Sequence, residues 1–171
     1  TSTTTYYNVQ NRALAKNVSA ITDGFNMFGE TYTTNSDTYY EYTSRVGTVD
    51  DGAFKDRPIV GILDAAPDAT FTQTVTTGED IYGSHYTTRS TTTYYDVQNR
   101  ALAKNVSAVT DGFNMFGETY TTNSDTYYKY TSRTGTKDDG SFEGKPIVGI
   151  LDASPDATFT QTVTTGEDIY G

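Results

Sequence analysis

The chain contains no cysteine, no tryptophan and only one histidine among its 171 residues. Without cysteine no disulfide can form, and neither a thiolate metal site nor a cysteine nucleophile is possible. Because His85 is the only histidine, the chain cannot supply a Ser-His-Asp triad to each half, or a site built on several histidines. These absences argue against an enzyme, and we expect no catalytic residue and no cofactor other than calcium.

Basic residues and long apolar runs are also scarce. Lys and Arg number 12 against 22 Asp and Glu, which gives a formal net charge of −10. Such a chain lacks the basic stripe that neutralises phosphates, so nucleic acid is not an expected partner. No window approaches the roughly 20 apolar residues of a membrane-spanning helix, so no transmembrane segment is expected.

Threonine and tyrosine, in contrast, are abundant. Threonine occurs 34 times and tyrosine 15 times, while hydrophobic residues make up only 35% of the chain. Threonine, tyrosine, valine, isoleucine and phenylalanine suit the half-buried surface of a β-sheet. The composition therefore predicts a mainly β protein with a lean core.

The chain is a tandem repeat. The stretch DGFNMFGETYTTNSDTYY occurs unchanged at 23–40 and 111–128, and 72 of the 82 positions of 2–83 match those 88 residues later. We predict a first β repeat at 1–83, a linker at 84–89 and a second β repeat at 90–171. Short strands separated by turn residues favour two tandem β-sandwiches of immunoglobulin-like size. A β-solenoid, with about four coils in each repeat, is the alternative.

Particular segments of each repeat carry strand signals. PIVGILDA is the best candidate for a buried strand, and Ile81 and Tyr82 are expected to form a short closing strand. TDGFNMFGE, with two glycines around Phe25, Met27 and Phe28, predicts a turn that leads into a core strand.

Acidic residues beside glycines are candidate calcium ligands, because calcium prefers several oxygen ligands from acidic loops. The spacing matches neither an EF-hand nor a glycine-rich calcium repeat, and ordinary turn and surface acids are the simpler interpretation. The candidate metal residues are Asp50, Asp51, Glu79, Asp80, Asp138, Asp139, Glu167 and Asp168.

The triplet NVS at Asn17 and again at Asn105 is an N-glycosylation sequon. The many threonines offer further acceptors for O-linked sugars. Covalently attached glycans are therefore an expected modification.

Near-identity of neighbouring repeats makes strand exchange inexpensive, since a strand pairs with a neighbour's sheet almost as well as with its own. The opening strand of each repeat could complete another unit by β-augmentation. The predicted assembly strand comprises Thr3, Thr4, Thr5, Tyr6, Tyr7 and Val9.

In its tandem layout and threonine-rich, polar composition the chain resembles extracellular filament and surface-array repeat proteins, such as pilus-like, S-layer and adhesin repeats. The resemblance is one of architecture and includes no diagnostic motif. It implies a structural subunit at the cell surface or outside the cell, whose partners are further copies of itself and glycans. The alternative is an adhesin module with two equivalent sites for carbohydrate or calcium.

Overall fold

The computed structural model describes residues 1–64, 66, 69–97, 100–154 and 157–167. Twelve strands and two short 3-10 helices make up the described chain. In chain order they are β1 (Ser2–Val9), β2 (Arg12–Phe25), β3 (Thr31–Tyr39), β4 (Tyr42–Val46), η1 (Val49–Phe54), β5 (Pro58–Leu63), β6 (Phe71–Glu79), β7 (His85–Asp96), β8 (Ala101–Phe113), β9 (Thr119–Tyr127), β10 (Tyr130–Thr134), η2 (Lys137–Phe142), β11 (Pro146–Leu151) and β12 (Phe159–Glu167).

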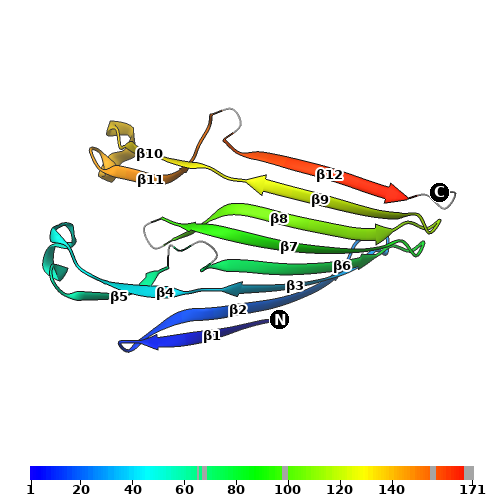
Figure 1. The fold of residues 1–171 in the computed structure, drawn as a ribbon, viewed down its shortest axis with the longest axis horizontal. Helices are drawn as coiled ribbons and strands as arrows, with labels where there is room; N and C mark the ends of the chain where they lie inside the picture. The colour runs from blue at the N-terminus through cyan, green and yellow to red at the C-terminus, as the bar shows by residue number, and fades with distance from the viewer. Residues whose placement is uncertain (65, 67–68, 98–99, 155–156, 168–171) are drawn as a thin grey trace.

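Eight long strands form one antiparallel sheet in the order β1-β2-β3-β6-β7-β8-β9-β12. The remaining strands make two hairpins, β4-β5 and β10-β11, that project from the same end of the sheet, with η1 and η2 at their tips (Figure 1). The N-terminus lies at the β1 edge of the sheet, and β12, the last described strand, forms the other edge (Figure 1).

The predicted mainly β class is confirmed. The sheets are open and antiparallel, which is consistent with a sandwich-like fold. A solenoid would stack its strands in parallel, whereas every strand pairing here is antiparallel. No helix in the described part of the chain is long and apolar enough to cross a membrane.

Both repeats contribute to the same sheet. Strands β1, β2, β3 and β6 come from the first repeat, and β7, β8, β9 and β12 come from the second. Most of the predicted linker, 84–89, lies in β7, which is hydrogen-bonded to β6 on one side and to β8 on the other. The division into two repeats as folding units stays a prediction.

Threonine explains why these segments form strands. Its β-branched side chain suits a pleated surface, and cross-strand hydroxyl pairs stabilise neighbouring strands. Thr38 on β3 and Thr72 on β6 lie opposite each other with their hydroxyl oxygens 2.8 Å apart. Thr88 and Thr110 repeat this pairing between β7 and β8, again at 2.8 Å.

The molecule buries very little. Leu63, Ala69 and Ala157 are the buried apolar side chains of the described residues, and they lie near the roots of the two hairpins. The accessible surface is 11621 Å², whereas a compact monomer of 18.7 kDa exposes about 8,300 Å². The structure is therefore an open sheet rather than a globule around a core.

Two apolar groups that were predicted to belong to core or closing strands are instead exposed at turns. Phe25 ends β2, and Met27 and Phe28 lie in the following turn, where Met27 is 90% exposed. The Asn26 side chain accepts hydrogen bonds from the backbone amides of Phe28 and Glu30 and closes this turn. The predicted turn is present and leads into strand β3, but its apolar side chains are exposed rather than part of a core.

The predicted closing strand at Ile81 and Tyr82 is likewise a turn, which joins β6 to β7. Asp80 accepts hydrogen bonds from the backbone amides of Tyr82 and Ser84, and Gly83 adopts a positive φ of 83°. PIVGILDA does form a strand, β5, in which Leu63 is buried as predicted.

Alternating glycine and tyrosine residues form a row across the sheet near its turn end. The row runs through Gly24, Tyr32, Gly78, Tyr86, Gly112, Tyr120 and Gly166. Each tyrosine ring lies over the glycine of the preceding strand: a Cβ atom on Gly24, for example, would meet the Tyr32 ring at 2.3 Å. Glycine is needed in this row because the ring occupies the place of its side chain.

We predict that Gly112→Ala lowers the free energy of unfolding by about 1–3 kcal/mol, the usual cost of overpacking. Its new Cβ would lie 2.5 Å from the Tyr120 hydroxyl oxygen and 2.8 Å from the carbonyl oxygen of His85. Urea denaturation measures the change. Gly166→Ala is the matched control, since among the described residues no ring covers this glycine and the nearest atom, the carbonyl oxygen of Thr119, would lie 3.1 Å from the new Cβ. Equal losses in the two variants would contradict the role of the ring.

Candidate assembly site

The two outer strands of the sheet each have one free edge. Strand β1 pairs with β2 alone, and β12 pairs with β9 alone. The backbone groups on their outward sides are therefore available to another strand.

Strand β12 has the sequence of a strand that is covered on both sides. Its residues FTQTVTTGE are identical to those of β6, which lies between β3 and β7. The sequence of β12 is therefore suited to pairing on both sides, as β6 pairs with β3 and β7, but in this structure β12 pairs with β9 alone.

Strand β1 is the counterpart of the strand that covers β6. Its residues STTTYYNV recur at 90–97 as STTTYYDV, and 90–96 form the second part of β7. The one difference is Asn8 against Asp96. The two free edges of the molecule thus carry the sequences of two strands that already pair inside it.

The internal pairing of β6 with β7 has a defined register and a specific side-chain contact. Phe71 lies opposite Thr93, and Thr74 lies opposite Ser90. The Tyr94 hydroxyl oxygen lies 2.7 Å from the Thr72 hydroxyl oxygen, at hydrogen-bonding distance. This contact joins the last long strand of the first repeat to the first strand of the second.

Three large side chains are more exposed at the free edges than at the equivalent inner positions. Tyr6, the counterpart of the half-buried Tyr94, is 60% exposed. Phe159 and Val163 are 47% and 52% exposed, whereas their counterparts Phe71 and Val75 are half-buried. The difference measures what the missing neighbour would cover.

Neither edge strand carries the usual protection against pairing. Natural sheets often block an edge with lysine or proline, but STTTYYNV and FTQTVTTGE contain neither residue. The register between β1 and β2 shifts between Thr5 and Tyr6, where Lys16 of β2 is the extra residue. The register between β7 and β8 shifts in the same way between Thr93 and Tyr94, and β7 still pairs with β6.

The predicted assembly residues all lie in β1, the outer strand: Thr3, Thr4, Thr5, Tyr6, Tyr7 and Val9. Their role in assembly stays a prediction. Sequence reasoning missed the other edge, Phe159–Glu167. Its signal was the identity of β12 with β6, but that identity has meaning only once β6 is known to pair with β7.

In each hairpin tip one aspartate forms an ion pair with an arginine of the same hairpin. Asp51 accepts a bidentate interaction from Arg45, at 2.6 and 2.7 Å, and also accepts from the backbone amide and hydroxyl of Thr48. The Arg45 guanidinium and the Thr48 amide hold the pKa of this carboxyl well below its usual range. Asp139 makes the same contacts with Arg133 and Thr136 in the second repeat, with the same effect on its pKa.

The other described calcium candidates lie in the two 3-10 helices and at the ends of β6 and β12. Asp50 and Asp138 belong to η1 and η2, and Glu79 and Glu167 end β6 and β12. Asp80 accepts hydrogen bonds from Ser84 and from nearby turn amides, which lower its carboxyl pKa. Asp168 lies outside the described residues. In the part of the chain that the structure covers, no three acidic or histidine side chains gather as a metal site, and calcium binding stays a prediction.

Both sequon asparagines lie within strands, half-buried. The side-chain amide of Asn17 in β2 donates to the carbonyl oxygen of Thr38, at 3.3 Å, and that of Asn105 in β8 donates to Thr126, also at 3.3 Å. A glycan would be attached to this same nitrogen, so its attachment would replace a cross-strand hydrogen bond. Glycosylation of both residues stays a prediction.

The only histidine begins β7. His85 lies opposite Glu79 and opposite Phe113, and its ring centroid is 5.8 Å from that of Phe113. These residues line a hollow of about 320 Å³ at the turn end of the sheet.

Comparison of the chain with known protein families, with curated proteins and with solved structures found no match. The functional argument therefore depends on the geometry of this sheet.

The hairpin tips give a prediction about pH. The Asp139 carboxyl pKa is lower in the folded chain than its ordinary value of about 3.9. The ionised carboxylate therefore stabilises the folded tip fully above a pH of about 3.9, and this stabilisation is lost as pH falls through the lowered pKa of the folded chain. We expect the NMR signal of the Thr136 amide to stay constant from pH 7 to about 4 and to move only at lower pH. Its titration with a midpoint near 4 would contradict the arginine contact.

Asp139→Asn should shift the Thr136 amide signal already at pH 7 and leave the Thr48 signal unchanged. Asp51→Asn, the matched change in the first repeat, should do the reverse.

Proposed function

We propose that this protein is a structural subunit of an extracellular filament or surface layer, and that it polymerises head to tail through the β12 edge of one copy and the β1 edge of the next. One observation carries the proposal: the free edge strand β12 repeats the sequence of β6, the free edge strand β1 repeats the second part of β7, and β6 and β7 pair with each other inside the molecule. The internal contact is thus a template for the contact between copies.

The template specifies the register. Subtracting the repeat length of 88 from the β7 positions and adding it to the β6 positions converts each internal pair into a pair between copies. Phe159 of one copy then lies opposite Thr5 of the next, and Thr162 lies opposite Ser2. Every residue from Ser2 to Thr5 has a partner on β12.

The template also supplies a side-chain contact. Tyr6 and Thr160 are the counterparts of Tyr94 and Thr72, whose hydroxyl oxygens are 2.7 Å apart. In the proposed contact the Tyr6 ring crosses onto the neighbouring copy and its hydroxyl group reaches the Thr160 side chain. The ring, now 60% exposed, becomes covered in the same way as that of Tyr94.

This contact does not close on itself. Each copy presents one edge of each kind, so a bound copy still offers a free edge to the next, which is the condition for an open filament. Each copy adds eight strands, which at about 4.8 Å per strand gives a step of about 38 Å along the filament.

The proposed setting is outside the cell or on its surface. It is supported by the threonine-rich composition and by the sequons at Asn17 and Asn105, at which glycans would be attached. The proposed partners are thus further copies of this chain and covalently bound sugars.

Negative-stain electron microscopy of the purified chain at several concentrations tests the proposal. Filaments with a step of about 38 Å, formed from strands at the spacing of a β-sheet, are the expected result. Deletion of residues 1–10 should abolish them, and unchanged filaments after this deletion would exclude the β1 edge. Single particles at every concentration would refute the function.

Tyr6→Phe provides a finer test. Loss of one hydrogen bond costs about 1 kcal/mol, so the critical concentration for assembly should rise about fivefold, as measured by sedimentation. Tyr94→Phe removes the equivalent bond inside the chain. This control should lower the stability of the subunit by about 1 kcal/mol and leave the critical concentration unchanged.

A further inference from the structure

One face of the eight-stranded sheet consists of small, uncharged side chains in straight rows. One row has threonine on seven successive strands: Thr22, Thr34, Thr76, Thr88, Thr110, Thr122 and Thr164. The next row is Ser2, Ala20, Ser36, Thr74, Ser90, Ala108, Ser124 and Thr162, and the third is Thr4, Val18, Thr38, Thr72, Thr92, Val106, Thr126 and Thr160. These rows lie on the same face as the glycine–tyrosine row, because their positions differ by two along each strand. We call this the hydroxyl face.

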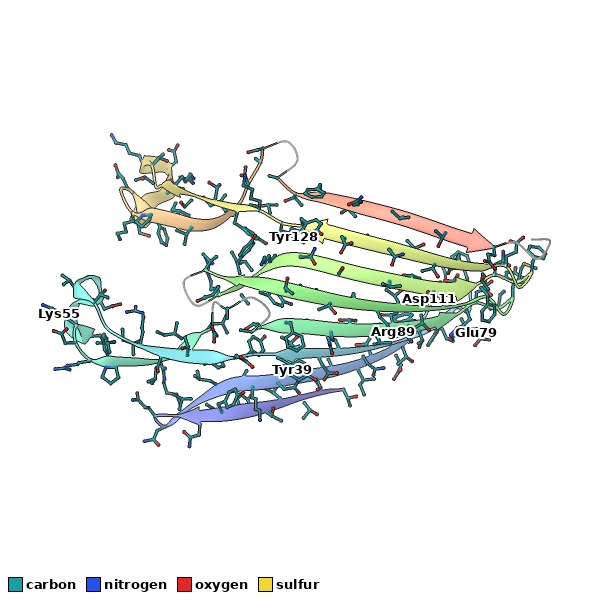
Figure 2. All side chains as sticks on the ribbon, in the orientation of Figure 1. Tyr39, Lys55, Glu79, Arg89, Asp111 and Tyr128 are labelled. Carbon is teal, nitrogen blue, oxygen red and sulfur yellow. The ribbon has the colours of Figure 1, made fainter. Side chains whose placement is uncertain are left out.

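The opposite face carries most of the charges in the middle of the sheet, at the register positions that alternate with the three rows: Asp23, Asp37, Glu79, Arg89, Asp111, Asp125 and Glu167. Asp96, beyond the three rows at the end of β7, lies on the hydroxyl face. Glu79, Arg89 and Asp111 are labelled in Figure 2 on the neighbouring strands β6, β7 and β8. We call this the charged face. Acids dominate it, so two copies that met through it would repel.

The hydroxyl groups of the hydroxyl face largely satisfy one another. Thr34 and Thr76 lie with their hydroxyl oxygens 3.1 Å apart, and Thr122 and Thr164 with theirs 3.0 Å apart. Burial of hydroxyl groups that already have partners avoids the penalty of leaving them unsatisfied. The methyl groups of these threonines are then free to make apolar contacts.

The three rows themselves carry no aromatic side chain, and Tyr94, on the same face, lies with its hydroxyl oxygen 2.7 Å from that of Thr72. The rings of Tyr32 and Tyr120 lie over neighbouring glycines rather than projecting outward. The hairpins approach the sheet through Tyr7 and Tyr95, whose rings meet Tyr42 and Tyr130 in edge-to-face contacts. Tyr95 follows Tyr94, which points to the hydroxyl face, so the hairpin contacts belong to the opposite side.

The accessible surface is larger than that of a compact monomer of the same mass. The accessible surface of 11621 Å² exceeds that of a compact monomer of this mass by about 3,300 Å². A stable protein–protein interface buries about 1,600 Å² in total. The three rows of the hydroxyl face contain no charged side chain, so their burial requires no charge to be desolvated.

We propose that the hydroxyl face packs against the hydroxyl face of a second copy, so that the assembled protein is two sheets thick. A face with uniform rows of small side chains is complementary to itself, as a twofold contact requires, and two such sheets pack about 10 Å apart. The ribbon form of this assembly rests on the proposed function, whereas the face-to-face pair itself does not depend on the edges.

Mass per unit length of the filaments, measured by scanning transmission electron microscopy, tests the inference. One copy of 18.7 kDa per step of about 38 Å gives about 4.9 kDa per nm for a single sheet, and a double sheet gives twice that value. We expect the double value for the unmodified chain. Filaments at the single value would overturn the face-to-face contact while leaving head-to-tail assembly in place.

Two neighbouring residues of β7 provide matched variants. Ser90 lies on the hydroxyl face and Thr91 on the charged face, and both are half-buried in the middle of the sheet. Ser90→Lys should halve the mass per unit length, because two facing lysines cannot be buried together. Thr91→Lys should leave it at the double value. An equal effect of both variants would overturn the proposal.

A third measurement tests the face-to-face pair even if Ser90→Lys does not fold or no filaments form. Because pairing stabilises only the folded chain, the urea midpoint of the unmodified protein should rise with protein concentration, and sedimentation below the filament concentration should find a dimer. A dimer without filaments would refute the edge contact and keep the face contact. A folded monomer with a constant midpoint, or one that binds insoluble polysaccharide through this face, would overturn the inference.

Discussion

The backbone hydrogen bonds between antiparallel strands are the interaction on which this structure depends. Most small proteins fold around apolar side chains, but only Leu63, Ala69 and Ala157 are buried apolar residues in the described part of this chain. The fold instead consists of eight hydrogen-bonded strands, in which the residues of each strand lie opposite defined residues of its neighbours. A sheet held in this way can be continued by any strand of matching register, whereas a fold held by a closed core cannot.

The repeat uses this property within a single chain. A period of 88 residues places one set of four long strands after another in a single sheet, and the contact between the sets is of the same kind as the contacts within them. Near-identity would be a hazard for a protein that must stay monomeric. For a subunit that adds to itself, it ensures that every junction has the same geometry.

Sequence alone predicted the mainly β class, the repeat and several strands, because threonine-rich alternation and an 88-residue identity are local or countable signals. It could not place both repeats in one sheet. The strand that joins them begins at His85, in a segment that has no copy, and its pairing with β6 is a long-range choice. Phe25 and Ile81 misled for a related reason: apolar side chains normally predict burial, but here Phe25 at the end of β2 and Ile81 in a turn are both exposed. The β12 edge was missed because an edge is a property of the sheet order, not of the strand's own residues.

The glycine–tyrosine row gives the sheet a direction. Tyr32, Tyr86 and Tyr120 all lean toward the strand that precedes them in the sheet, and the last glycine of the row, Gly166, is left without a ring. Copies added in one order would therefore form a polar fibre, with chemically distinct ends that grow at unequal rates. A cell that secretes or anchors such a fibre from one end could control its orientation through that end alone.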